Sequence, residues 1–201
     1  MSTAVDGVSR HAGARTEEAR LEAAGEFVKR VQELDRGELA ALKRNAGNTL
    51  GEARGVMWFY RLLDDEDRWN PEIPFLVATL VGLNKYADEG DFGQCMRELA
   101  NHPRSSPASV DRRFRILLDA QFGVADGYRP GGGELAYRLR QMVKLAASRQ
   151  VGIGWAQLLV DLRRWNREGK PVQRRWAKHF YKPRDEPAPA GGDETNATQD
   201  E

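Results

Sequence analysis

Basic side chains recur on the outward faces of the helices that we predict in the second half of the chain. In the first of these helices, Val110, Phe114 and Leu117 share one face at about 100° of rotation per residue, and arginines lie opposite or beside it. Three later helices repeat this arrangement. Guanidinium and ammonium groups spaced along helices can neutralise successive phosphates of a nucleic acid. The basic residues assigned to this role from helical periodicity are Arg112, Arg113, Arg115, Arg138, Arg140, Lys144, Arg163 and Arg164.

A solvated surface is the alternative explanation, since Arg and Lys also cover the outer faces of ordinary helical proteins. Such surfaces mix both signs of charge, whereas Asp111, Asp119, Asp161 and Glu168 offset only a minority of the basic residues here. This imbalance favours a groove for a polyanion. The sequence has no zinc-finger spacing and no aromatic RNP pattern, so contacts would go mostly to phosphate and would be independent of base sequence.

Residue types that carry catalysis are sparse. The single cysteine and the three histidines are Cys95, His11, His102 and His179. None of them lies at metal-ligand spacing from another. Carboxylates cluster at 64–67 and 88–91, but neither run has the Gly-punctuated pattern of a calcium loop, and we interpret both runs as solvated helix ends. No nucleophile–base pair can be assembled, so we expect no enzymatic activity, no metal and no cofactor.

The total charge of +1 hides a strong polarity along the chain. Residues 1–100 contain 13 Lys/Arg and 18 Asp/Glu, residues 101–184 contain 18 Lys/Arg and 6 Asp/Glu, and residues 185–201 contain six carboxylates and no base. The middle range therefore has a net charge of +12. An excess of this size is more than solubility requires and points to an anionic partner.

Helical periodicity dominates the sequence, and β-alternation, heptads and repeats are absent. We therefore predict an all-α fold made of two small helical bundles, one at 17–101 and a basic one at 108–182. Residues 1–16 and 183–201 have little to bury and are predicted to be a disordered leader and a disordered acidic tail. Further local predictions are a helix from Thr49 to Leu62, a deeply buried helix from Ile73 to Tyr86, and a cap at Ser109.

No run of 18 apolar residues is present and the first residues lack an apolar core, so neither a membrane span nor a secretory signal is predicted. A single cysteine excludes an internal disulfide framework and fits a reducing compartment. The expected location is the cytoplasm.

Four stretches of the chain resemble the CasB family, the small subunits of the type I-E CRISPR Cascade complex. They are GELAALKRNAGNTLGEARGVMWFYRLL (37–63), DRRFRILLDA (111–120), ELAYRLRQMVKLAASRQVGIGWAQLLVDLRRWN (134–166) and VQRRWAKHFY (172–181). The resemblance extends over residues 20–182.

The resemblance implies a non-enzymatic protein that forms a homodimer among other Cascade subunits. Its basic surfaces would support the guide crRNA, the target DNA strand and the displaced non-target strand. The positions that match basic residues of the family are Lys43, Arg44, Arg112, Arg113, Arg138, Arg140 and Lys144. A stand-alone helical DNA-binding regulator or protein adaptor is the alternative, and it would bind a defined duplex as a symmetric dimer.

Overall fold

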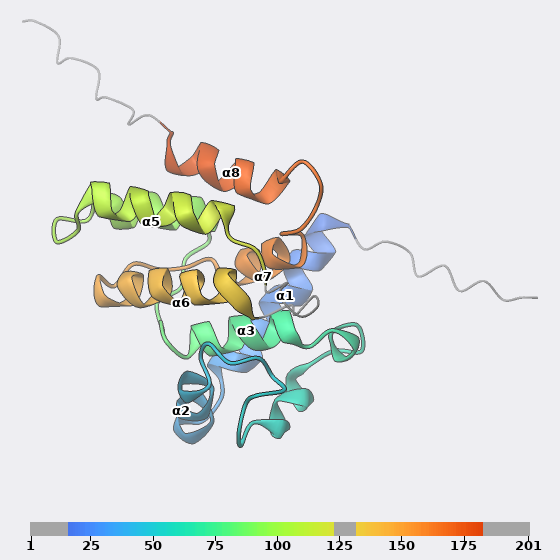
Figure 1. The fold of residues 1–201 in the computed structure, drawn as a ribbon. Coiled ribbons are helices and arrows are strands. Elements are labelled where there is room, and N and C mark those ends of the chain that lie inside the picture. The colour runs from blue at the N-terminus through green and yellow to red at the C-terminus, as the bar shows by residue number, and fades with distance from the viewer. Residues whose placement is uncertain (1–15, 123–131, 183–201) are drawn as a thin grey trace, which may run out of the picture.

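The computed structural model describes residues 16–122 and 132–182, and Figure 1 shows that they fold mainly into helices. The described ranges contain no strand, so the predicted all-α class is confirmed. None of the helices described is long and apolar enough to cross a membrane. The helices are α1 (Glu17–Gln32), α2 (Arg36–Arg44), the 3-10 segments η1 (Met57–Leu62) and η2 (Asp67–Trp69), α3 (Glu72–Val81), α4 (Phe92–Asn101), α5 (Pro107–Asp119), α6 (Gly133–Ser148), α7 (Trp155–Arg163) and α8 (Pro171–Phe180).

The predicted leader at 1–16 and the predicted tail at 183–201 fall outside the described residues, with the exception of Thr16. The Thr16 hydroxyl accepts a hydrogen bond from the Ala19 N–H at 3.3 Å. Because this bond satisfies one of the free N–H groups at a helix start, Thr16 acts as the N-cap of α1.

The predicted helix from Thr49 to Leu62 is wrong in its first half, where the chain forms turns, and only η1 is helical. Asn45 is buried and its side-chain amide bonds both backbone groups of Arg54, donating to the carbonyl at 3.1 Å and accepting from the N–H at 3.0 Å. These side-chain bonds compete with helical ones. Gly55 adopts a φ of +70°, which favours glycine and interrupts a helix.

The N-cap of α5 is Ser106 and not the predicted Ser109. The Ser106 hydroxyl accepts from the Ser109 N–H at 3.4 Å. Pro107 follows at the first helical position, where a missing N–H removes no helical hydrogen bond. The outward face of α5 is unchanged by this correction, because the helical phase of its apolar residues is the same.

The helix α3 lies at the centre of the fold, as its uninterrupted apolar sequence predicts. Every residue from Ile73 to Val81 is buried, and α3 packs against α1, α2, α6 and α7. Figure 1 shows α3, α6 and α5 as successive layers, with α6 in the middle. The helix ends at Val81, before the predicted end at Tyr86, and the chain then turns at Leu83.

Helices from both halves of the sequence interlock. The helix α7 packs against α1 and α3, and α8 packs against α4. Trp176 on α8 contacts Phe92 on α4 and Trp165 after α7, with ring centres 5.0 Å apart in both pairs. A Cβ on Gly93 would overlap the backbone of Trp176, so glycine permits the close approach of α4 and α8. The ranges 17–101 and 108–182 therefore share one continuous core, and their division stays a prediction.

The reactivity of Cys95 reports whether the packing around α4 excludes solvent in the native protein. Its side chain is buried on α4, and burial raises the pKa of its thiol well above the usual value. Because the thiolate is the reactive form, we expect a chromogenic disulfide reagent to modify Cys95 far more slowly in native than in unfolded protein at neutral pH. Absorbance after mixing, with and without guanidinium chloride, measures both rates. Equal rates of modification in native and unfolded protein would contradict the burial of Cys95 on α4.

Candidate nucleic-acid interface

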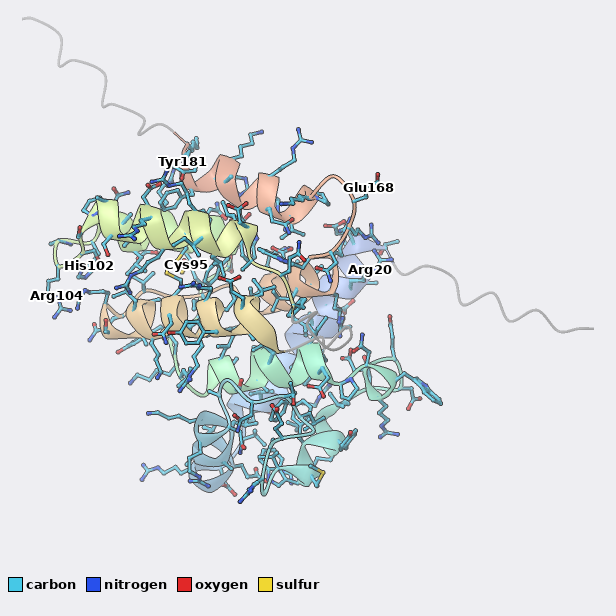
Figure 2. All side chains as sticks on the ribbon, viewed as in Figure 1. Arg20, Cys95, His102, Arg104, Glu168 and Tyr181 are labelled. Carbon is cyan, nitrogen blue, oxygen red and sulfur yellow. The ribbon has the colours of Figure 1, made fainter. Side chains whose placement is uncertain are left out.

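Exposed basic side chains gather on the outer surface of α5 and α6, which pack against each other. Phe114 and Leu117 on α5 and Leu139 and Val143 on α6 are fully buried, so the opposite side of each helix faces outwards. Figure 2 shows long side chains projecting away from both helices. We define the α5–α6 face as the exposed or half-buried residues Arg112, Arg113, Tyr137, Arg138 and Lys144.

The charge of the α5–α6 face is largely uncompensated. Arg112, Arg113 and Lys144 are exposed and make no ion pair with a carboxylate of residues 16–122 or 132–182. Arg138 is held by Glu134 one turn earlier, with 3.1 Å between Nη2 and Oε1. Its guanidinium also lies 5.6 Å from the ring centre of Tyr137, within cation–π range. Three predicted positions therefore carry a positive charge that no carboxylate of the described residues pairs with.

Arg115 differs from its neighbours on α5 because it has a carboxylate partner. Its Nη2 lies 3.0 Å from Asp111 Oδ2, and the Tyr181 hydroxyl donates to Asp111 Oδ1 at 2.6 Å. Burial and the Asp111 carboxylate together raise the pKa of Tyr181 to about 12. Arg115 thus belongs to a small polar contact near the end of α8 in addition to being a predicted nucleic-acid residue.

A second pair of predicted residues lies at the end of α2, close to Arg140. Lys43 and Arg44 are exposed in the last turn of α2. Arg140 is half-buried and reaches from α6 to the loop that follows α2, where its Nη1 would lie 3.1 Å from a Cβ on Gly47. Gly47 has a φ of +103°, a backbone conformation that favours glycine. Arg140 also occupies the space that a side chain at this position would need. Arg140 therefore extends from α6 to the loop that follows α2.

Arg163 and Arg164 lie at the end of α7, and N-terminal carboxylates oppose their charge. Arg163 pairs with Asp67, and Arg164 Nη1 lies 2.9 Å from Glu17 Oε2. Burial raises the pKa of Asp67 even though Arg163 opposes this change, whereas the hydrogen bond from Arg164 lowers the pKa of Glu17. These two of the residues predicted to bind nucleic acid are thus paired with carboxylates.

Two further arginines share a cleft with Arg163 and Arg164. This cleft of about 170 Å³ is also lined by Arg20, from α1, and Arg167, after α7. Figure 2 labels Arg20 on the right of the molecule, beside the start of α1. Helical periodicity could not place Arg20 here, because the packing of α1 on α7 joins segments that are far apart in the sequence.

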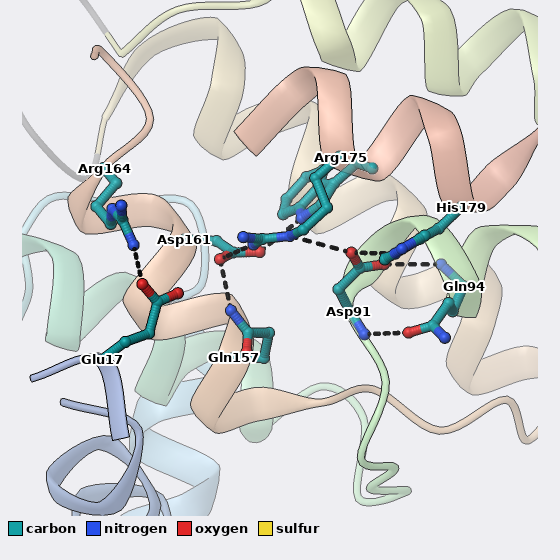
Figure 3. Close-up of polar contacts among 9 residues, drawn as sticks. Glu17, Asp91, Gln94, Gln157, Asp161, Arg164, Arg175 and His179 are labelled. Carbon is teal, nitrogen blue, oxygen red and sulfur yellow. Dashed lines mark hydrogen bonds and ion pairs between the residues drawn. The ribbon is translucent and has the colours of Figure 1, made fainter. Parts of the chain in front are cut away.

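Arg175 turns inwards from α8, although the sequence places it among the basic residues of that helix. Figure 3 shows its guanidinium between Asp161 and Asp91. Burial lowers the pKa of Arg175, but the hydrogen bond and charge of Asp161 outweigh this effect and raise it. Asp161 also accepts from the Trp176 indole N–H at 2.6 Å, and Asp91 Oδ2 lies 2.6 Å from His179 Nδ1. These contacts fasten α8 to α4 and α7.

The two acidic runs are not merely solvated helix ends. Asp67 and Asp91 are both 5% exposed, and each pairs with an arginine from the second half of the chain. Asp91 also caps α4 through a reciprocal pair of hydrogen bonds with Gln94. Asp65, in contrast, has a 98% exposed side chain, as the interpretation expects. Tertiary packing therefore divides each run into buried and exposed members.

Among the described residues, both histidines make hydrogen bonds within the chain and the cysteine is buried, whereas His11 lies outside the described residues. His179 bonds Asp91, His102 Nδ1 accepts from the Arg104 N–H at 3.2 Å, and Cys95 is buried. Within the described ranges, no three His, Cys, Asp or Glu side chains come together in a way that could hold a metal ion. The site that the fold does present is a set of basic surfaces on a compact helical scaffold.

The fold and the candidate site define an all-α protein with basic surfaces. Comparison with known proteins shows the family to which it belongs. Residues 38–181 match the model of the CRISPR-associated protein Cse2 family. The chain therefore belongs to the Cse2 family. A curated Cse2 protein of Thermus thermophilus is 35% identical over 112 residues, which are 55% of this chain and 56% of that relative. The chain thus matches only a little over half the length of this relative.

Solved structures give the same result over a larger part of the chain. The crystal structure of M. ruber CasB is 31% identical, with a TM-score of 0.61 over 81% of this chain and 92% of that one. The crystal structure of a Cse2-family protein from Thermus thermophilus is 29% identical, with a TM-score of 0.62 over 80% and 97%. A chain of a CRISPR RNA-guided surveillance complex, 19% identical over 80% and 92%, shares the fold with a TM-score of 0.65.

Proposed function

We propose that this chain is a non-catalytic small subunit of an RNA-guided CRISPR surveillance complex of the Cascade type. Its basic surfaces bind the backbones of the guide RNA and target DNA, independently of base sequence, and stabilise the displaced DNA strand. The observation that carries this proposal is the α5–α6 face, where Arg112, Arg113 and Lys144 have no described carboxylate partner. Family membership supports the assignment to such a complex.

The physical role follows from how RNA-guided complexes read DNA. Base pairing with the guide supplies sequence choice, and the exchange of a DNA duplex for an RNA–DNA duplex is nearly balanced in free energy. Protein contacts to the backbone can therefore decide whether the exchange goes to completion. A rigid helical scaffold with phosphate-binding side chains suits this role, and further surfaces would contact a second copy of the chain and other Cascade subunits.

Purification of the complex tests the proposal directly. We expect a tagged chain, expressed in its native cells with its CRISPR locus, to copurify with the other Cascade subunits and a short RNA of uniform length. Gel electrophoresis and sequencing of the RNA identify it as guide RNA. A chain that purifies alone and binds one defined DNA duplex as a symmetric dimer would contradict the proposal and support a stand-alone regulator.

A further inference from the structure

A hollow between α5 and α6 opens within the α5–α6 face. Its volume is about 270 Å³, and the described residues that line it are Arg113, Tyr137, Arg138, Gln141 and Met142. Met142 is buried and contributes apolar surface to the lining, whereas Tyr137 is 52% exposed. A large exposed aromatic side chain that lines such a hollow is unusual, because aromatic rings of this size normally bury most of their surface.

The lining combines the three kinds of group that hold an unpaired nucleotide. Tyr137 offers an aromatic surface for stacking, and Arg113 and Arg138 offer positive charge for the neighbouring phosphates. Gln141 is half-buried, and its side-chain amide makes no hydrogen bond with the described residues. An amide can both donate to and accept from the edge of a base.

We propose that this hollow binds one unpaired base of a single nucleic-acid strand, stacked on Tyr137. The inference rests on the proposed function and adds a preference for single strands over duplexes. In a duplex the bases are stacked on one another, so only their edges and the backbone are accessible to the protein. A strand displaced from its duplex exposes its bases, and stacking on an aromatic side chain tolerates any base sequence.

Contacts within the chain position some of the groups that line the hollow. The ion pair between Arg138 and Glu134 fixes the guanidinium beside the Tyr137 ring. Both helices are anchored by buried apolar residues on their opposite sides. Groups that are positioned in advance reduce the ordering that binding of a base requires, which favours binding.

Binding of labelled oligothymidine to the full chain, measured by fluorescence anisotropy over a range of salt concentrations, tests the proposal. We expect Tyr137→Ala to weaken binding by roughly five- to a hundredfold, because base–aromatic stacking contributes energies of this order. The slope of affinity against salt should not change, since that slope counts phosphates neutralised and Tyr137 carries no charge. Tyr137→Phe keeps the ring and should bind as the unchanged protein does.

Two controls separate stacking from other effects. Tyr60→Ala removes a ring that is 42% exposed on η1 and should leave affinity unchanged. An oligomer of the same length that lacks bases should bind the unchanged chain and Tyr137→Ala equally. If Tyr137→Ala binds oligothymidine as tightly as the unchanged chain, the base site is wrong and the phosphate-binding face stands. If the unchanged chain binds no oligomer at any salt concentration, both the base site and the nucleic-acid function are wrong.

Discussion

Replacing Arg112, Arg113 and Lys144 together with alanine is expected to weaken nucleic-acid binding on the order of a hundredfold at about 0.1 M salt. These three side chains are exposed and make no ion pair with a described carboxylate. Each phosphate contact to a single strand contributes about 0.7 to the slope of log affinity against log salt concentration, so the slope should fall by about 2. Surface substitutions of this kind leave stability within about 0.5 kcal/mol.

Fluorescence anisotropy titrations at several salt concentrations measure this effect, and a second triple variant controls for the loss of charge. Lys29, Arg36 and Lys85 are also exposed but lie on α1, at the start of α2 and after α3. Their replacement with alanine removes the same three charges from other parts of the molecule. A control variant that loses as much affinity and slope as the first would show that binding follows net charge and not the α5–α6 face.

Replacing Asp161 with alanine is expected to destabilise the fold by about 3 kcal/mol, because it removes the acceptor of one buried and two half-buried donors. Asp161 is 1% exposed and accepts from Arg175, from the Trp176 indole at 2.6 Å, and from Gln157 at 2.7 Å. Without this carboxylate the indole N–H loses its partner in the core, and the half-buried guanidinium keeps only Asp91.

Thermal unfolding followed by circular dichroism measures this loss, and a chain of this size should unfold at a temperature lower by roughly 6–12 °C. Asp65→Ala is the matched control, since Asp65 also pairs with an arginine, at 3.4 Å from Arg68, but in full exposure. An exposed pair of this kind contributes at most about 1 kcal/mol. Equal melting temperatures for Asp161→Ala and Asp65→Ala would contradict the view that the Asp161 contacts fasten α8.

Most helices could be predicted from the sequence because apolar spacing is a local property. Apolar spacing predicts helices at 92–99, 134–148 and 172–181. The helices α4, α6 and α8 begin and end within about two residues of these bounds, which is the usual uncertainty of helix ends. The predicted helix from Thr49 is wrong because of side-chain hydrogen bonds and not because of apolar spacing. The side chain of Asn45 bonds the backbone of Arg54, and this arrangement depends on a folded loop that periodicity does not describe.

The residues of the candidate site also include some that the sequence predicts and others that only the fold reveals. Exposure of Arg112, Arg113 and Lys144 follows from the apolar faces of α5 and α6, so helical phase alone predicts it. Lys43 and Arg44 came from the resemblance to the CasB family, and only the fold shows that Arg140 reaches the loop beside them. The hollow at Tyr137 could not be predicted either, because its lining comes from two helices.

The sequence by itself determined the helical class, the outward direction of most basic residues and the family. Only the tertiary structure decided which of these charges remain free. Arg163 and Arg164 meet Asp67 and Glu17 across separations of 96 and 147 residues, through the packing of α1 and η2 beside α7. A helical period states which side of a helix a residue occupies, but the partner on that side belongs to another segment. That partner is set by how the helices pack around their common core.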